Sequence, residues 1–250
     1  MFKILDCTLR DGGYYNNWDF DIDLINDYLQ SMADLNIDLI EIGFRTNLKD
    51  KYFGPLAYCH SDFIKHLKIP VKIKKRLGVM INAGEFTKLK SNNKITDYLE
   101  NLFPKQDKSI ISFVRIACHE KEILKSFKIT NWLKKRGIKV FFNLMQISEI
   151  TNESLIKIIK KSNSYSIDGF YIADSLGSLY AHQVTTIVHT LKKYSKVKIG
   201  IHAHNNKLMA LANSLQAVSC GVEYVDSTIK GMGRGCGNAQ TEYLYIEKNK

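Results

Sequence analysis

The chain contains few of the residues that interrupt or cross-link a polypeptide. It has three prolines and five cysteines, which are Cys7, Cys59, Cys118, Cys220 and Cys236, and no two cysteines have CxxC spacing. An odd number of thiols without that motif argues against a disulfide framework and favours a reducing, cytoplasmic compartment. No linker rich in glycine, serine or proline divides the 250 residues, so a single catalytic domain over residues 1–250 is expected.

Long apolar runs are also missing. None approaches the roughly 20 residues that span a bilayer. The N-terminus, MFKILDCTLRDGG, becomes polar too early for a signal peptide. Neither membrane insertion nor secretion is therefore expected.

A regular alternation of strand-like and helix-like segments fills the chain instead. Eight short apolar, β-branched runs lie at residues 3–7, 39–44, 77–81, 110–116, 138–144, 168–173, 197–202 and 224–229. The segments between them have helical periodicity; for example, Ile22, Ile25, Leu29 and Met32 recur at three- and four-residue intervals. This alternation predicts parallel βαβ units in an α/β fold. Eight units favour a (β/α)8 TIM barrel with its active site at the C-terminal mouth, and an open doubly wound sheet is the alternative.

The end of the sequence is short for this architecture. Only about a dozen helical residues follow the eighth predicted strand, before the polar tail EKNK. Either the closing helix is short or the chain stops before a further segment. No C-terminal partner-docking domain and no regulatory domain is expected.

The formal charge of +11 raises the question of a nucleic-acid partner. The basic runs lie at residues 72–76, 134–136 and 192–196, each just before an apolar strand. Cations there complement the negative end of the preceding helix, and in a barrel they would ring the face opposite the active site. No aromatic platform for bases is interleaved with them. We therefore expect no nucleic-acid partner.

Polar side chains at strand ends are the candidates for chemistry, because these ends meet at the mouth of a barrel. His202 and His204 lie two residues apart on one strand, so both imidazoles point to the same face. Two imidazoles at a mouth make a natural chelate for a divalent ion, to which Asp11 could add a carboxylate. Arg10 beside it can bind a substrate carboxylate or stabilise an oxyanion.

A glycine-rich loop, KGMGRGCGNAQTE, follows the last strand and leads into a helix. Its glycines, Gly233 and Gly235 among them, would let the backbone approach a ligand closely. The loop matches neither a P-loop nor a dinucleotide-binding GxGxxG motif. It is either a substrate-binding loop or a connector.

Together these motifs resemble the DRE-TIM metallolyases, a superfamily that includes 4-hydroxy-2-oxovalerate aldolase, HMG-CoA lyase and isopropylmalate synthase. The resemblance rests on LDCTLRDGG, EIGF, VRIA, FNLMQIS, YIADSLGS, GIHAHNN and GMGRGCGNAQTE. It is nearest in pattern to the catalytic domains of 4-hydroxy-2-oxovalerate aldolases. The resemblance implies metal ligation by Asp11, His202 and His204, with Asn238 completing the coordination or lying just behind it.

The same resemblance implies roles for three further residues. Arg10 would stabilise an enolate oxygen. Glu41 and Asp174 match acidic positions near the family's active site, where they would order water, substrate or the metal ligands. The alternative for both is a buried strand-end carboxylate that accepts backbone amides. Apart from the resemblance, the position of Arg45 directly after EIGF suits it to bind a second carboxylate or phosphate of the substrate, or equally to pair with a surface acid.

The sequence departs from the aldolase pattern after Asp11. Bacterial aldolases place a catalytic histidine there as base, whereas this chain continues with Gly13, Tyr14 and Tyr15. Tyr14 is therefore the candidate base, although a phenol ionises well above neutral pH and would need help from a metal or an arginine. Cys236 lies nearer to Asn238 than the reactive cysteine of HMG-CoA lyase would, and is expected to be a small packing residue.

The expected function is thus a divalent-metal-dependent lyase or aldolase that cleaves or forms a C–C bond of a 4-hydroxy-2-oxo acid through a pyruvate-type enolate. The expected metal is Mn2+, with Mg2+, Zn2+ or Co2+ as alternatives. The partners would be a small 2-oxo acid and an aldehyde, and the barrel could form a homo-oligomer. One alternative is an acyl-CoA condensing synthase or acyl-CoA lyase, which would bind acyl-CoA. Another is a catalytically decayed binding protein.

Overall fold

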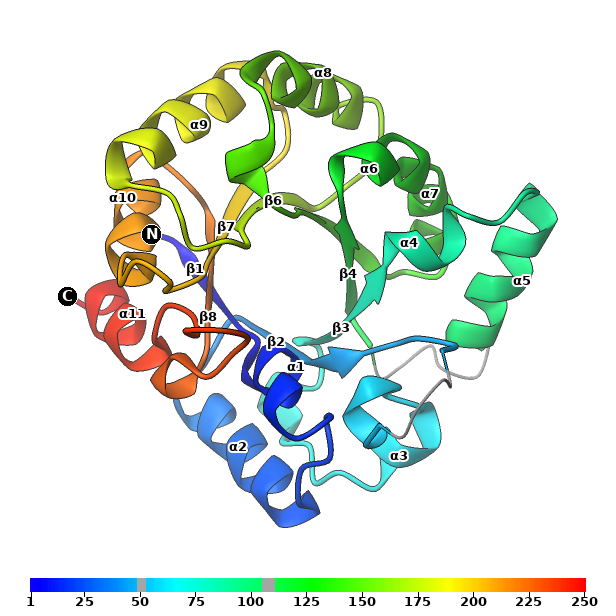
Figure 1. Ribbon diagram of the computed structural model, residues 1–250. Helices are drawn as coiled ribbons and strands as arrows, with labels where there is room; N and C mark the ends of the chain where they lie inside the picture. The colour runs from blue at the N-terminus through cyan, green and yellow to red at the C-terminus, as the bar shows by residue number, and fades with distance from the viewer. Residues whose placement is uncertain (49–52, 105–110) are drawn as a thin grey trace.

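A computed structural model describes residues 1–48, 53–104 and 111–250. Eight parallel strands pair in sequence order and close between β1 and β8 into a barrel. The helices surround it, as Figure 1 shows. The strands are β1 (Lys3–Asp6), β2 (Leu39–Phe44), β3 (Leu77–Asn82), β4 (Phe113–Cys118), β5 (Lys139–Leu144), β6 (Gly169–Asp174), β7 (Ile199–Ala203) and β8 (Tyr224–Ser227). The predicted (β/α)8 barrel is confirmed, and the open sheet is excluded by the β1–β8 pairing.

The helices differ widely in length around the barrel. They are α1 (Thr8–Asp11), α2 (Ile22–Asp34), α3 (Ser61–Lys65), α4 (Ala83–Phe86), α5 (Asn92–Leu102), α6 (Glu120–Ser126), α7 (Thr130–Lys134), α8 (Asn152–Ser162), α9 (Ala181–Tyr194), α10 (Ala210–Ser219) and α11 (Thr241–Lys248). In the described part of the chain, no helix combines the length and apolarity needed to cross a membrane.

The predicted strands are all present, and their ends differ from the prediction by at most three residues. The largest difference is at β4, which begins at Phe113; Ile110, where the prediction began, lies outside the described residues. The eighth strand ends at Ser227, before the predicted Ile229, because Thr228 turns to the glycine-rich loop and donates its N–H to the carbonyl of Ala239. Strand ends depend on these neighbours, which apolar patterning does not reveal.

Helix α2 forms largely as its periodicity predicts. Asp21 caps it by accepting the N–H groups of Asp23 and Leu24. Ile25 and Leu29 are buried against the barrel together with Met32. Ile22, which shares the apolar spacing, is 42% exposed, because it is the first helical residue and the barrel wall does not cover it.

The closing helix α11 is short, with eight residues, and lies beside β1. Leu244 of this helix is fully buried. Lys248 pairs with the carboxylate of Asp38 at 2.5 Å. The same carboxylate accepts the N–H of Ile4 in β1. The end of the described chain is thereby attached to the start of the barrel.

Side chains that point into the barrel stack in layers contributed by alternate strands, as in other (β/α)8 barrels. The registers place Glu41, Arg115, Tyr171 and Asp226 of the even strands in one layer. Towards the mouth, the next layer from the odd strands contains Cys7, Met80, Asn143 and His202. Below these layers, Leu5, Leu39, Phe113, Phe141 and Tyr224 fill the barrel as an apolar cluster, which also includes Cys7 and Tyr171 from the two layers above. The interior is thus polar near the mouth and apolar below it.

Candidate metal centre and active site

Three predicted ligands meet at the mouth of the barrel. Asp11 ends the short helix α1, while His202 lies on β7 and His204 directly follows that strand. One ligand atom from each lies within 4.8 Å of the other two, and all three side chains are buried. Nε2 of His202 is 3.3 Å from Nε2 of His204 and 4.0 Å from Oδ2 of Asp11.

The hydrogen bonds of the two imidazoles determine which nitrogens face each other. Nδ1 of His202 lies 2.8 Å from the carboxylate of Asp226, and Nδ1 of His204 lies 3.3 Å from the carbonyl of Gly237. Because these oxygens are acceptors, each Nδ1 carries a hydrogen. In the neutral form that binds metal, each ring therefore directs the lone pair of Nε2 towards the other ring. Two facing lone pairs repel each other unless a cation lies between them. This arrangement fits a divalent metal ion.

The electrostatics of the cluster favour the protonation states that bind metal. The pKa of His204 is lowered to about 4. Burial is the largest cause, and the neighbouring His202 also lowers the pKa, by more than Asp11 raises it. For Asp11, burial disfavours ionisation, but Arg10 and the two histidines overcome this effect and lower its pKa to about 2. Near neutral pH, Asp11 is therefore an anion and His204 is neutral, as ligands must be.

Asn238 supplies a fourth candidate donor from the glycine-rich loop. Its Nδ2 donates to Oδ2 of Asp11 at 2.5 Å, and its Oδ1 is buried without a hydrogen-bond partner among the described residues. An unsatisfied buried amide oxygen is costly, and coordination of a cation would satisfy it. The donor set is then one carboxylate, two imidazoles and one amide oxygen, which suits a hard or borderline divalent ion.

Gly233 allows the loop to approach these ligands. A Cβ at this position would lie 2.1 Å from Nδ2 of Asn238 and 2.6 Å from Oδ2 of Asp11. Gly235 has a different function, because its φ of +64° is in the left-handed region that favours glycine. Both predicted substrate-binding glycines therefore shape the loop, and Gly233 does so against the predicted ligands Asp11 and Asn238.

Two buried arginines connect the ligands to the interior of the barrel. Arg10 bonds Asp11 at 2.6 Å and Glu41 at 2.7 Å. Arg115 bonds the same Glu41 at 2.7 and 2.9 Å and also pairs with Asp226. Two guanidinium groups thus face three carboxylates, which leaves one negative charge beside the candidate metal position. The pKa values of Arg10 and Arg115 are raised, because the adjacent carboxylates outweigh the effect of burial.

Arg115 and Asp226 were not predicted as functional residues. Each is a charged residue in the middle of an apolar strand, in VRIA and YVDS. Since burying a charge is costly unless it is paired, this pattern was the signal that could have identified them. Sequence separation hid the pair, because its members are 111 positions apart.

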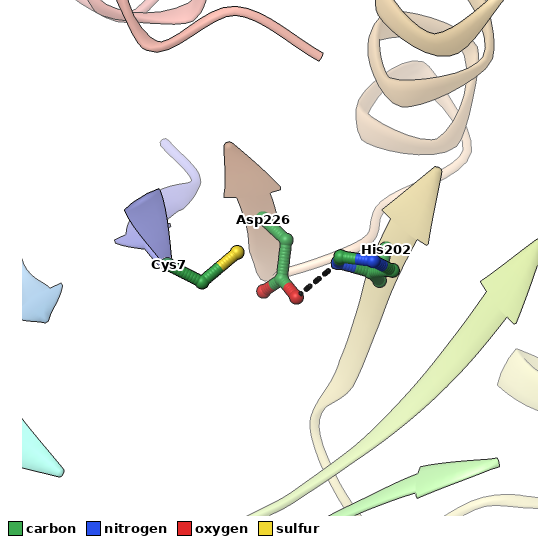
Figure 2. Close-up of side chains that lie close together, drawn as sticks. All are labelled: Cys7, His202 and Asp226. Atoms are coloured by element: carbon green, nitrogen blue, oxygen red, sulfur yellow. Dashed lines mark hydrogen bonds and ion pairs between the residues drawn. The ribbon is translucent and has the colours of Figure 1, made fainter. Parts of the chain in front are cut away.

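Cys7 joins His202 and Asp226 in a second cluster below the first (Figure 2). The Cys7 thiol donates to the carbonyl of Ser227 at 3.4 Å, and burial raises its pKa well above the ordinary value. A thiol that stays protonated is a poor metal ligand. In Figure 2 the Asp226 carboxylate lies between the other two side chains and bonds His202. We therefore assign this cluster to the support of His202.

A narrow cleft of about 60 Å³ opens at the mouth above the ligands. It is lined by Arg10, Asp11, Tyr14, Phe44, Met80, Asn82, Ala117, Asn143, Met145, Ala173, Ser175, His202, His204 and Arg234. Nη2 of Arg10 and Oδ1 of Asn143 are buried there without a hydrogen-bond partner among the described residues. The cleft thus presents one donor and one acceptor next to the candidate metal position.

Comparison with known proteins agrees with this architecture. A family model described as HMGL-like matches residues 109–247. The chain is also 30% identical, over 97% of its length, to a 4-hydroxy-2-oxovalerate aldolase of Carboxydothermus hydrogenoformans, of which it covers 69%. This chain belongs to the HMGL-like family. The predicted resemblance is therefore confirmed, and the protein is an enzyme of a family of metal-dependent lyases.

Other relatives of this HMGL-like chain differ in name or in distance. An oxaloacetate decarboxylase of Mycobacterium tuberculosis is 26% identical over 96% of the chain and 68% of the relative. Among solved structures, the N-terminal domain of a presumed aldolase from Bacteroides vulgatus has a TM-score of 0.83 and 32% identity, with coverage of 100% of this chain and 80% of that one. The HMG-CoA lyase of Bacillus subtilis has a TM-score of 0.78 at 17% identity, covers 99% and 86% respectively, and shares the fold.

The remaining predicted residues of the HMGL-like barrel do not all reach the cleft. Asp174 is buried, and its two carboxylate oxygens accept the N–H groups of Ser178 and Leu179 at 3.0 Å each. Asp174 therefore holds the loop after β6. This matches the alternative expected from the sequence, a buried strand-end carboxylate that accepts backbone amides. Glu41 is also inaccessible, but among the described residues it bonds Arg10 and Arg115 and no backbone amide. It positions Arg10 and does not line the cleft.

The prediction for Arg45 as a substrate-binding residue at the mouth does not hold. Its guanidinium donates to the carbonyls of Cys59 and Leu102 and packs over the ring of Phe103 at 4.9 Å. It lines a different hollow with His60, outside the lining of the mouth cleft described above. The reason is a register shift between Glu41 and Phe44 in β2, after which Phe44 faces the cleft and Arg45, the next residue, points to the other face.

Tyr14 and Cys236 are both more exposed than the residues of the candidate metal centre. Tyr14 lines the cleft, is 47% exposed, and packs edge-on against Trp18 with 4.8 Å between ring centroids. Trp18 in turn donates to the backbone carbonyl of Arg10 at 2.7 Å. Cys236, expected to be a packing residue, is exposed, because the glycines around it turn the loop outward.

Proposed function

We propose that this protein is a divalent-metal-dependent aldolase that cleaves or forms the C–C bond of a 4-hydroxy-2-oxo acid through a pyruvate-type enolate. The observation that carries the proposal is the pair of facing Nε2 atoms of His202 and His204 beside ionised Asp11 at the mouth. A bound divalent ion supplies Lewis-acid stabilisation of negative charge on the substrate. We propose Mn2+ as that ion, since imidazole and oxygen donors are mixed.

Arg10 stabilises the enolate oxygen in this scheme. Its Nη1 and Nε are held by Asp11 and Glu41, which leaves the buried Nη2 to donate to the substrate. A guanidinium fixed in advance and shielded from water stabilises developing charge without reorganising. Glu41 and Arg115 keep Arg10 in place, and so act as positioning residues.

Tyr14 is the proposed acceptor of the hydroxyl proton during cleavage. Within the described cleft lining, the ionisable side chains are the three predicted ligands, two arginines and Tyr14. The ligands are committed to the metal and the guanidinium groups retain their protons. Tyr14 therefore remains as the proposed proton acceptor.

The same lining favours a second candidate function, the decarboxylation of a 2-oxo diacid. Loss of carbon dioxide from such a substrate generates the same enolate but requires no base to remove a hydroxyl proton. The relative named oxaloacetate decarboxylase makes this reaction worth testing. Tyr14→Phe separates the two: aldol cleavage should fall by about 100-fold or more, whereas decarboxylation should be nearly unchanged.

Exchange of the pyruvate methyl protons for deuterium, followed by NMR in heavy water, tests the proposal without the natural aldehyde. We expect exchange with Mn2+ or Mg2+, none after chelation, and none in His202→Ala. Absence of exchange from protein with bound metal would reject pyruvate as the enolised unit and direct attention to an acyl-CoA, tested by thermal shift with acetyl-CoA. Absence of both exchange and metal binding would contradict the proposed aldolase activity. It would support the alternative of a catalytically decayed binding protein.

A further inference from the structure

The end of the barrel opposite the metal centre contains a ring of four cations. Lys3 begins β1 and Lys139 begins β5. Arg76 immediately precedes β3 and Lys198 immediately precedes β7. These are the four odd-numbered strands, so an equivalent position on each carries positive charge.

All four side chains are directed towards the axis of the barrel. Side chains two apart on a strand share a face. Lys3 and Lys139 are each two residues before Leu5 and Phe141, which belong to the apolar cluster inside the barrel. Arg76 and Lys198 stand in the same relation to Gly78 and Gly200, whose added Cβ atoms would meet the interior rings of Phe113 and Tyr171 at 2.3 and 2.5 Å.

The ring lies within one basin of about 630 Å³, roughly ten times the volume of the mouth cleft. Leu39, Phe141 and Tyr224 contribute to its apolar floor. Lys75 and Lys196 also line it. The apolar cluster lies between this basin and the predicted ligands at the mouth. Binding in the basin therefore does not require an occupied metal centre.

Two carboxylates line the basin, and both already have partners. Asp38 accepts the N–H of Ile4 at 2.9 Å and pairs with Lys248. Asp168 accepts the N–H of Val140 at 2.7 Å and pairs with Lys134 at 2.8 Å.

The five lysines that line the basin take no part in the ion pairs of Asp38 and Asp168. Over the described ranges, none has a salt bridge to a carboxylate; they are Lys3, Lys75, Lys139, Lys196 and Lys198. Arg76 differs, because its Nη1 is fixed by the carbonyl of Ile37 at 2.7 Å. A concave surface with unbalanced charge of one sign concentrates the opposite ion.

We propose that this basin is a binding site for a small phosphate-rich anion of the diphosphate class. Residues at this end of a (β/α)8 barrel ordinarily serve stability, but four cations facing one axis repel one another and oppose it. A diphosphate group carries several negative charges on a compact body and can contact opposing walls at once. A nucleic-acid backbone fits less well, because the charges converge inside a basin and do not follow an extended surface.

Calorimetric titration of the full chain with sodium pyrophosphate at low ionic strength tests the site. We expect one anion per chain, weaker binding as salt is added, and at least tenfold weaker binding in Lys139→Gln/Lys198→Gln. Both residues are exposed, so the fold should persist, as circular dichroism would verify. The matched control is Lys72→Gln/Lys135→Gln, which removes the same charge from exposed lysines outside the basin and should bind as wild type.

His202→Ala separates this site from the metal centre and should bind pyrophosphate normally, even if the proposed lyase activity is lost or was never present. A titration with ADP distinguishes a free diphosphate from a nucleotide carrying one. The proposal is overturned if wild type does not bind, if both lysine pairs lose affinity equally, or if only His202→Ala loses it. Tighter binding of a single-stranded oligonucleotide, in competition with pyrophosphate, would also overturn it in favour of nucleic acid.

Discussion

The Asp226 carboxylate lies 2.8 Å from Nδ1 of His202, on the neighbouring strand of the barrel. Arg115 pairs with the same carboxylate, and together with His202 it lowers the pKa of Asp226, although burial acts in the opposite direction. An ionised carboxylate only accepts hydrogen bonds, so Nδ1 of His202 must carry the hydrogen. Asp226 therefore turns Nε2 towards the mouth, where the predicted metal site lies.

Replacing the Asp226 carboxylate should weaken metal binding, although Asp226 is not itself a predicted ligand. In Asp226→Asn the amide can bond His202 in either orientation, and the preference for one imidazole tautomer is lost. We expect an approximately 10- to 100-fold loss of Mn2+ affinity, measured by calorimetry, since that is the usual effect of removing such a supporting group.

The variant also breaks a buried ion pair with Arg115, so stability needs its own control. Asp6→Asn removes another fully buried carboxylate, one that bonds Tyr28 and Thr241 and contacts no predicted ligand. It should lower the melting temperature while Mn2+ affinity stays near that of wild type. Equal losses of affinity in the two variants would mean that Asp226 acts only through stability.

A methyl group at position 233 should disrupt the metal site. In Gly233→Ala the new Cβ would clash with Asn238 and Asp11, whose nearest atoms lie at 2.1 and 2.6 Å. We expect at least a tenfold loss of metal affinity and of metal-dependent exchange. Gly84→Ala is the control, because its nearest neighbour is the flexible end of Glu122 at 3.1 Å, outside the site. Normal metal binding by Gly233→Ala would show that the loop can move away from the ligands.

The chelator-treated protein should lose stability as pH falls from about 6.5 towards 4. The pKa of His204 is about 4 in the folded state and 6.5 ordinarily, because burial and His202 disfavour its cation. Between these values the unfolded chain binds the proton, so the stability present above pH 6.5 is lost as pH falls through this window. Urea unfolding at pH 7 and pH 5 measures it.

His204→Gln should flatten this pH dependence, whereas substitution of the exposed His66 should leave it unchanged. If His204→Gln and wild type lose the same stability between the two pH values, another group is responsible for the effect.

The cysteines should differ sharply in their reaction with iodoacetamide. Burial raises the pKa of Cys59 to about 12 and raises that of Cys118 as well, so neither forms the reactive thiolate in the folded protein at pH 8. Cys236 is exposed at the mouth loop and should be modified first, as peptide mass spectrometry would show. In urea all thiols should react. Early labelling of Cys59 in the folded protein would contradict its burial.

The sequence by itself determined the barrel and pointed to the three residues that form the candidate metal centre. Eight apolar runs separated by helical segments require burial on both faces of a parallel sheet, and that requirement is local to each run. The histidines were found because the two-residue alternation of a strand is also local. Asp11 and Asn238 were placed by motifs that are continuous in sequence, within LDCTLRDGG and GMGRGCGNAQTE.

Only the tertiary structure decided which charged residues share an environment. Glu41 and Asp174 are both acids of strands, yet one neutralises two arginines and the other caps a loop. Arg45 was assigned to the mouth and lies outside it, whereas Arg115 lies inside the barrel.

The same distinction applies to the ring of Lys3, Arg76, Lys139 and Lys198, whose members are scattered along the chain. Barrel closure brings together residues that are remote in sequence, and the field of each charge depends on distances that no local pattern contains. Local periodicity was therefore sufficient for the architecture, while pairing, accessibility and electrostatics came only with the closed barrel.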